Sequence, residues 1–193
     1  ITDLTPSAGW ATASFNSTLS YFICNFSDAT TPNVYTLCDS KGKNIRTIND
    51  NASYKSKWQE APKKEFFTMQ SDGYTLNGYM LKPNDFVPSH KYPVIMYQYS
   101  GPQSQLVCNK WNMEWLNYVA TRGYIVMCVD GRGTGGRGKD FAALVYKQLG
   151  YYETIDQLAA ARYAASLPYV DADRIGIFGW SYGGYMTIMA MTE

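Results

Sequence analysis

Residues 179–184 read Gly-Trp-Ser-Tyr-Gly-Gly and contain the pattern G-x-S-x-G, which sets a serine between two glycines. The motif follows an apolar run that suits a strand and precedes an apolar segment that suits a helix. A strand that turns sharply into a helix strains the central residue, and glycines on either side leave room for the turn. We therefore predict that Ser181 is held out above a sheet as a nucleophile, and not in an ordinary glycine-rich turn.

Tyr182 follows the serine at the predicted start of the helix. Backbone N–H groups and the helix dipole favour negative charge at that position. We expect the N–H of Tyr182 to donate to the oxyanion that forms when Ser181 attacks a carbonyl group. A serine hydroxyl is a weak nucleophile without a base, so the spacing alone predicts acyl transfer and nothing narrower. Trp180 and the methionines of the helix are expected in the core.

Other titratable residues are predicted to have structural roles. Asp130 ends a strand, but in hydrolases with this motif the acid and then the histidine follow the serine, so we expect Asp130 to stabilise the turn before Gly131. Glu153 and Asp156 are expected to be charged residues of a first helical turn. His90 is the sole histidine and lies in a loop, so we expect it at the surface.

The elements that must position the serine alternate between strands and helices. Three apolar runs are too short for helices and each suits a strand buried on both faces: residues 94–99, 124–129 and 174–178. Helices are predicted between them at 111–122 and 154–167, the second beginning with a capping box of Thr154 and Gln157. This alternation is typical of a parallel sheet with right-handed crossovers, so the fold class is α/β.

The first third of the chain is predicted to be all β. From residue 9 to about 48, apolar and polar residues alternate in short runs, and turn residues separate them in a way that suits a propeller blade or the edge of a sandwich. Residues 49–60 are polar and resemble a connection. A hairpin is predicted next, with strands at 64–70 and 74–82 and a turn at Ser71-Asp72-Gly73.

Composition excludes several classes of partner and cofactor. The 17 Lys plus Arg and 16 Asp plus Glu give a net charge of +1. This charge creates no long-range electrostatic field that would attract nucleic acid. No apolar run is long enough to cross a bilayer. Cys24, Cys38, Cys108 and Cys128 lack metal-ligand spacing, so we expect no metal and no cofactor.

Two further features bear on the redox state and the compartment. A bridge between Cys24 and Cys38 is possible, and buried free thiols for all four cysteines are the alternative. Three asparagines open N-x-S/T triplets, which fits an exported protein: Asn16, Asn25 and Asn51.

Several segments resemble a known family. GWSYGG at 179–184 is similar to the nucleophile motif of the prolyl oligopeptidase family of serine peptidases, in its dipeptidyl peptidase IV branch. Three further matches follow the family order: YSGPQSQ at 99–105, DGRGTG at 130–135, and Leu149-Gly150 followed by Asp156-Gln157. The similarity covers about residues 60–193, while residues 1–58 resemble in style the end of the β-propeller that precedes the catalytic domain.

The resemblance implies an α/β-hydrolase fold for residues 59–193, comprising the N-terminal part of its sheet, after propeller-like strands at 1–58. It implies that the hydroxyl of Tyr99 donates to the oxyanion beside the N–H of Tyr182, whereas the alternative is a tyrosine that packs at a strand end. The implied reaction releases N-terminal dipeptides, with Pro or Ala in the second position, through an acyl-enzyme on Ser181.

The implied partners are peptide substrates with a free N-terminus and, for the full-length protein, a second copy in a homodimer. The implied location is secreted, periplasmic or at the cell surface. The sequence stops at Glu193, soon after Ser181, so it lacks the later strands that carry the acid and the histidine in this family. We therefore expect the chain to be a fragment that is inactive alone. Two other readings remain open, an esterase or acyl-peptide hydrolase on the same fold and a catalytically inactive binding protein.

Overall fold

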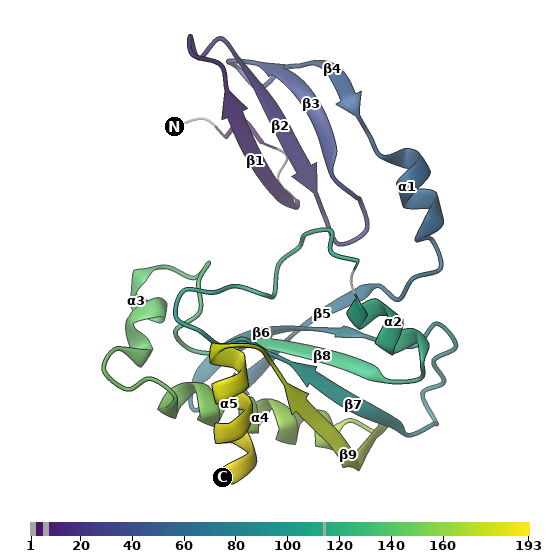
Figure 1. Ribbon diagram of the computed structural model, residues 1–193, viewed down its shortest axis with the longest axis vertical. Coiled ribbons are helices and arrows are strands. Elements are labelled where there is room, and N and C mark those ends of the chain that lie inside the picture. The colour runs from purple at the N-terminus through teal and green to yellow at the C-terminus, as the bar shows by residue number, and fades with distance from the viewer. Residues whose placement is uncertain (1–2, 6–7, 114) are drawn as a thin grey trace. The chain divides into compact units, whose positions relative to one another are not determined.

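Two β-sheets organise the part of the chain that the structure, a computed structural model, describes: residues 3–5, 8–113 and 115–193 (Figure 1). Contacts divide these residues into two units. The first unit contains the residues up to 61 together with 108–113, and the second contains 62–107 and 115–193. The sequence placed a boundary between residues 58 and 59, so the contacts add three residues and a distant segment to the first unit.

The sheet of the first unit is an antiparallel meander. Its strands lie in the order of the sequence: β1 (Trp10–Phe15), β2 (Tyr21–Ser27), β3 (Val34–Asp39) and β4 (Asn44–Asn49). The side chain of Asn16 accepts the backbone N–H groups of Ser20 and Tyr21 and so closes the turn between β1 and β2. The short strands expected between residues 9 and 48 are confirmed.

The four cysteines are free thiols. Cys24 is paired across the sheet with Thr36, and Cys38 with Phe22, so the two cysteines are diagonal neighbours. Both lie in the small core of this unit, where burial raises the pKa of each thiol. The bridge between Cys24 and Cys38 is absent, and the alternative of free thiols is confirmed.

Residues 49–60 contain a short helix, α1 (Ala52–Lys57), where the sequence indicated only a connection. None of the residues of α1 is buried, so the helix has no apolar face and the sequence shows no apolar periodicity there. The ring of Tyr54 on this helix lies 6.2 Å from that of Trp111, an edge contact within the first unit.

The segment 108–113 is held in the first unit by hydrogen bonds. The side-chain oxygen of Asn109 accepts the N–H of Ala29 at 2.9 Å, and the N–H of Trp111 donates to the hydroxyl of Ser27 at 3.4 Å. The helix predicted to begin at residue 111 therefore begins later, as α2 (Trp115–Thr121), and Glu114 lies outside the described residues. Spacing alone could not reveal that Trp111 belongs to another unit.

The sheet of the second unit has the order β5-β6-β8-β7-β9. Its strands are β5 (Lys64–Ser71), β6 (Tyr74–Leu81), β7 (Tyr92–Tyr97), β8 (Ile125–Asp130) and β9 (Val170–Phe178). The β5–β6 hairpin is confirmed, and its two turn residues, Asp72 and Gly73, both have positive φ as a tight type I′ turn requires. β7 runs parallel to β8 and β9, whereas β6 is antiparallel to its neighbours.

Helices cover both faces of this sheet (Figure 1). Along β8, Val126 and Cys128 pack with α2, while Ile125, Met127 and Val129 face the core that includes α4 (Tyr151–Ser166). The remaining helices are α3 (Lys139–Ala142), the 3-10 helix η1 (Ala143–Val145) and α5 (Tyr182–Thr192). The mixed α/β architecture is confirmed.

Strand burial departs from the expectation at the edge of the sheet. Every residue of β8 is buried, because β8 lies between β6 and β7 and has a core on each face. β9 ends the strand order, and only Val170 in it is buried. The prediction of burial on both faces is therefore right for β8 and wrong for β9.

The start of α4 also differs from the sequence prediction. The helix begins at Tyr151, because the carboxylate of Glu153 accepts the N–H of Gly150 at 3.0 Å and the hydroxyl of Thr154 donates to the carbonyl oxygen of Gly150. The predicted capping box of Thr154 and Gln157 is wrong. The side chains of Thr154 and Gln157 are both buried inside the protein.

Candidate active site

The backbone bends sharply at Ser181, between the end of β9 and the start of α5. Its φ of 50° and ψ of −117° lie outside the regions that residues with a side chain normally occupy. The residue is exposed. The predicted turn from strand to helix, with an exposed serine at its apex, is therefore confirmed.

Two glycines allow the end of β7 to approach this bend. A Cβ atom on Gly183 would lie 2.6 Å from the carbonyl oxygen of Gln98 and 3.1 Å from the Cα atom of Tyr99. A Cβ atom on Gly179 would contact the same oxygen of Gln98. The expected steric need for glycine at both positions is confirmed, but the obstacle lies mainly on the neighbouring strand.

Replacement of Gly183 by Ala is expected to destabilise the protein by about 1–3 kcal/mol, because the added methyl group overpacks a backbone contact. Gly184 is the matched control, since a Cβ atom there meets only the carbonyl oxygen of Gly179 at 3.5 Å, an ordinary contact. Gly184→Ala should be neutral or stabilising, as alanine favours a helix. Denaturant unfolding of both variants measures the difference, and equal stabilities would contradict the close approach of β7.

Tyr99 lies beside Tyr182, just past the end of β7. The two ring centroids are 6.3 Å apart. β7 and β9 are parallel neighbours, so the residues that follow their carboxyl ends meet at one edge of the sheet. The structure thus brings together all three predicted site residues: Tyr99, Ser181 and Tyr182.

The side chain of Tyr182 is anchored to α4. Its hydroxyl donates to Glu153 Oε1 at 2.7 Å, and burial, together with this bond to a carboxylate, raises the pKa of Tyr182. Glu153 is fully buried, although the sequence indicated a charged residue of a first helical turn. The backbone N–H of Tyr182 belongs to the first turn of α5, where N–H groups have no acceptor within the helix.

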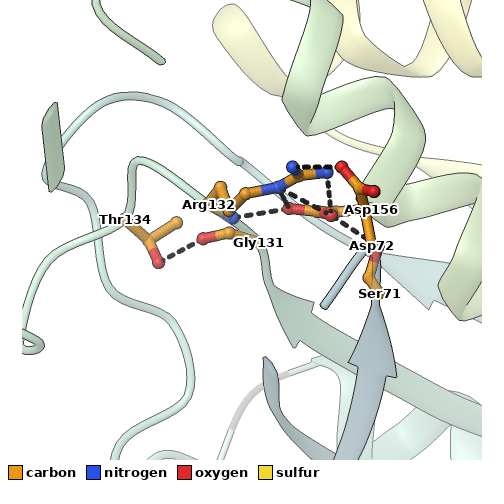
Figure 2. Close-up of polar contacts among 6 residues, drawn as sticks. All are labelled: Ser71, Asp72, Gly131, Arg132, Thr134 and Asp156. Atoms are coloured by element: carbon orange, nitrogen blue, oxygen red, sulfur yellow. Dashed lines mark hydrogen bonds and ion pairs between the residues drawn. The ribbon is translucent and has the colours of Figure 1, made fainter. Parts of the chain in front are cut away.

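Asp156 forms a buried ion pair with Arg132 (Figure 2). Its carboxylate is 0% exposed and accepts the backbone N–H of Arg132 at 2.7 Å, the guanidinium at 2.9–3.2 Å and the hydroxyl of Ser71 at 2.6 Å. The guanidinium also reaches Asp72 at 2.8 Å. Asp156 therefore ties the loop after β8 and the β5–β6 hairpin to α4, and is not a solvated first-turn charge.

Asp130 stabilises a different segment from the one predicted. Its carboxylate accepts the backbone N–H groups of Leu106 and Val107 at 2.8–3.2 Å. Burial raises the pKa of this carboxyl group above its ordinary value. The expected role in the turn before Gly131 is wrong, because the oxygens point to residues more than twenty positions earlier.

The remaining expectations have mixed outcomes. His90 is exposed, as predicted. Met186 is buried, but Met191 and Trp180 are 74% and 63% exposed, so the prediction of a core position is wrong for these two residues. Within the described residues, no cluster of three or more His, Cys, Asp or Glu could hold a metal ion, and no helix is long and apolar enough to cross a membrane.

Sequence reasoning assigned no role at the site to Arg132, Gln98 or Gln157, which are all buried. Arg132 lies inside the DGRGTG segment, and Gln98 directly precedes Tyr99. Buried polar side chains need partners, so a glutamine at the end of an apolar strand was the available signal. The local sequence pattern does not identify the hydrogen-bond partners of these side chains.

Comparisons with known proteins give matches over nearly the whole chain. Residues 108–193 match the sequence model of the prolyl oligopeptidase family. The chain is 38% identical to a probable dipeptidyl-aminopeptidase B of Pyrenophora teres f. teres, over 96% of this chain and 21% of the relative. It is also 38% identical to the protein of the same name in Metarhizium robertsii, over 98% of this chain and 22% of the relative. The chain thus spans about a fifth of the length of these curated relatives.

Solved structures with dipeptidyl peptidase names are among those that match the fold. One is dipeptidyl peptidase 4 of Porphyromonas gingivalis, with a TM-score of 0.94 and 46% identity, covering 98% of this chain and 28% of that one. Another is a putative dipeptidyl aminopeptidase IV from Bacteroides ovatus, with a TM-score of 0.86 and 34% identity, covering 97% of this chain and 28% of that one.

Proposed function

Because the chain belongs to the prolyl oligopeptidase family, we propose that it supplies the nucleophile and the oxyanion donors of a serine peptidase. The observation that carries this proposal is the exposed, strained Ser181 beside Tyr99 and Tyr182. In finer detail, residues 59–193 form the N-terminal part of an α/β-hydrolase sheet, since β7, β8 and β9 are parallel with helices on both faces. Residues 1–58 form the last strands of a propeller, whose blades are four-stranded sheets like β1–β4.

In the proposed reaction, Ser181 Oγ bonds to the carbonyl carbon of the scissile peptide while its proton passes to a histidine base. The carbonyl oxygen becomes an oxyanion, which accepts hydrogen bonds from the N–H of Tyr182 and the hydroxyl of Tyr99. The C–N bond then breaks, and the amine leaves with the proton from the histidine. Water hydrolyses the resulting acyl-enzyme by the same steps and restores the serine hydroxyl.

The base in this proposal is a histidine outside the 193 residues. His90 precedes the start of β7 and Tyr99 follows its end, so a strand of six residues, about 20 Å long, separates them. A base must lie within hydrogen-bond reach of the serine. His90 therefore does not serve Ser181.

For the substrate, we propose peptides with a free N-terminus, from which a dipeptide with Pro or Ala in the second position is released. The names of the relatives, probable dipeptidyl-aminopeptidase B and dipeptidyl peptidase 4, support the release of a dipeptide. The preference for Pro or Ala is what the resemblance to the family implies. The test is hydrolysis by the full-length protein of Gly-Pro and Ala-Pro chromogenic amides, compared with a simple ester. Cleavage of the ester alone would favour an esterase on the same fold and defeat the peptidase proposal.

Replacement of Tyr99 by Phe should lower the kcat of the full-length protein about 10²-fold, because one of two oxyanion donors is lost. The fold should be unchanged, since the ring and its contact with Tyr182 remain. Tyr118→Phe on α2 is the control, because its side chain is 64% exposed and its ring contacts Arg122 near the end of the same helix. Steady-state kinetics on the Gly-Pro amide make the comparison, and equal kcat values for the two variants would remove Tyr99 from the site.

A further inference from the structure

Three polar side chains of α4 are exposed by 1% or less, at positions where a helix that covers a sheet normally carries apolar residues. They are Glu153, Asp156 and Gln157, with exposed fractions of 0%, 0% and 1%. Asp156 bonds to Arg132, as described above. Of the other two, Glu153 bonds to Tyr182, the residue after the candidate nucleophile, and Gln157 bonds to Ser100, the residue after Tyr99.

The first connection runs from Glu153 to Tyr182. One carboxylate oxygen accepts the hydroxyl of Tyr182 at 2.7 Å, and the other accepts the N–H of Gly150 at 3.0 Å. Both oxygens of Glu153 are therefore engaged, which fixes the carboxylate. The far end of the Tyr182 side chain is thereby held, and with it the orientation of the residue whose N–H faces the proposed oxyanion.

The second connection runs from Gln157 to both sides of Tyr99. Gln157 Nε2 donates to the hydroxyl of Ser100 at 3.2 Å, and that hydroxyl donates to Gln98 Oε1 at 3.0 Å. Tyr99 is thus bracketed in the chain by two buried, hydrogen-bonded residues. Ser100 has a φ of 59°, a strained conformation that its neighbours must hold.

The same connection returns to the nucleophile. Gln98 Nε2 donates to the carbonyl oxygen of Gly183 at 2.6 Å, two residues after Ser181. It also donates to the hydroxyl of Thr187 on α5 at 3.1 Å. The hydrogen bonds from α4 therefore reach the end of β7 and the first turn of α5 and join them at Gln98.

The side chain of Gln157 also has one polar atom that forms no hydrogen bond. Among the described residues, its Oε1 atom is the buried side-chain atom without a hydrogen-bond partner. An unsatisfied buried oxygen costs free energy, so this side chain is not optimal for stability. Its two Nε2 bonds, to Ser100 and to the carbonyl oxygen of Val129, keep it in place.

We propose that Glu153 and Gln157 are positioning residues, which hold the N–H of Tyr182 and the hydroxyl of Tyr99 at a fixed separation around Ser181. This inference rests on the proposed function. Oxyanion donors act because they are already oriented when charge develops, and small displacements of such groups reduce the rate strongly. A single helix that holds both donors sets their separation directly.

The test uses the full-length protein and its kcat and KM on the Gly-Pro amide. Glu153→Leu removes the bond to Tyr182, and Tyr182→Phe removes the same bond from the other side while keeping the backbone N–H. Each should lower kcat about tenfold and leave KM within about twofold, because the substrate contacts remain. The double variant should be no slower than the slower single variant, since the two residues act through one bond.

Glu153→Gln is the conservative variant. Its amide can accept the N–H of Gly150 and donate to the oxygen of Tyr182, so kcat should recover most of the loss seen with leucine. Gln157→Met should lower kcat with little change in the unfolding midpoint, because loss of the unsatisfied oxygen offsets in part the loss of the bonds to Ser100 and to the carbonyl oxygen of Val129. Asp72→Asn is the matched control, because Asp72 also bonds to Arg132 but its side chain is 60% exposed. This variant should keep the wild-type kcat.

The outcomes separate the two proposals. Wild-type protein that hydrolyses neither the amide nor the ester would defeat the proposed function. An active wild-type protein, with kcat in Tyr182→Phe and Gln157→Met no lower than in Asp72→Asn, would overturn the positioning role alone. Should Glu153→Leu fail to fold, Tyr182→Phe still decides, because it leaves Glu153 in place.

Discussion

Replacement of Ser181 by Ala is expected to lower kcat/KM of the full-length protein on the Gly-Pro amide by on the order of 10⁴-fold or more, since the atom that forms the proposed acyl-enzyme is lost. The fold should be retained. Alanine keeps the Cβ atom of serine, so the backbone bend with φ of 50° costs about the same in both proteins. The loss is therefore chemical, and unfolding curves of the two proteins should coincide.

Labelling with a fluorophosphonate gives a second measurement of the same serine. Wild-type protein should be labelled and the Ser181→Ala variant should not. Ser89→Ala is the matched control, because that serine is also exposed and lies in the loop before β7. Label retained after loss of Ser181 would place the nucleophile elsewhere, and wild-type protein that never reacts would favour an inactive binding protein.

Replacement of Arg132 by Met is expected to destabilise the protein by about 3–5 kcal/mol, because it leaves a buried carboxylate without its counter-charge. Arg132 and Asp156 are 2% and 0% exposed. In the variant, the carboxylate keeps the hydroxyl of Ser71 and one backbone N–H but loses the guanidinium. Denaturant unfolding of the variant and the wild type measures the difference.

Asp72→Asn is the control for this prediction. Asp72 also bonds to Arg132, but its side chain is 60% exposed, and an ion pair with a solvated partner contributes about 0–1 kcal/mol. A second check is Arg132→Met combined with Asp156→Leu, which should recover part of the loss by removing the isolated charge. Equal destabilisation by Arg132→Met and Asp72→Asn would show that burial does not govern the pair.

Much of the fold followed from local patterns. The β5–β6 hairpin was predictable because Asp72-Gly73 suits a two-residue turn and alternating residues flank it. The runs that became β7, β8 and β9 were recognisable because they are apolar and too short for helices. Element ends were less predictable, as the start of α4 shows. The sequence does not distinguish a glutamate that accepts the N–H of Gly150 from a glutamate that is exposed to solvent.

The wrong predictions share one cause. The features that they concern depend on contacts between segments that are far apart in the sequence. Trp111 fitted the spacing of a helix but is held by Ser27 and Tyr54 in the first unit. Trp180 was expected in the core because tryptophan is apolar, yet it is 63% exposed on the bend beside Ser181. In both cases burial depends on what lies opposite, which residue type does not determine.

By itself the sequence determined the bend at Ser181, because so tight a bend needs glycines within two positions and adjacent residues are enough to identify that steric requirement. Only the tertiary structure decided what surrounds it. Glu153 and Tyr182 are 29 positions apart, and Ser71 and Asp156 are 85 apart. Buried polar groups must find partners, but which ones they find depends on how the strands and helices pack, and that is a property of the folded chain.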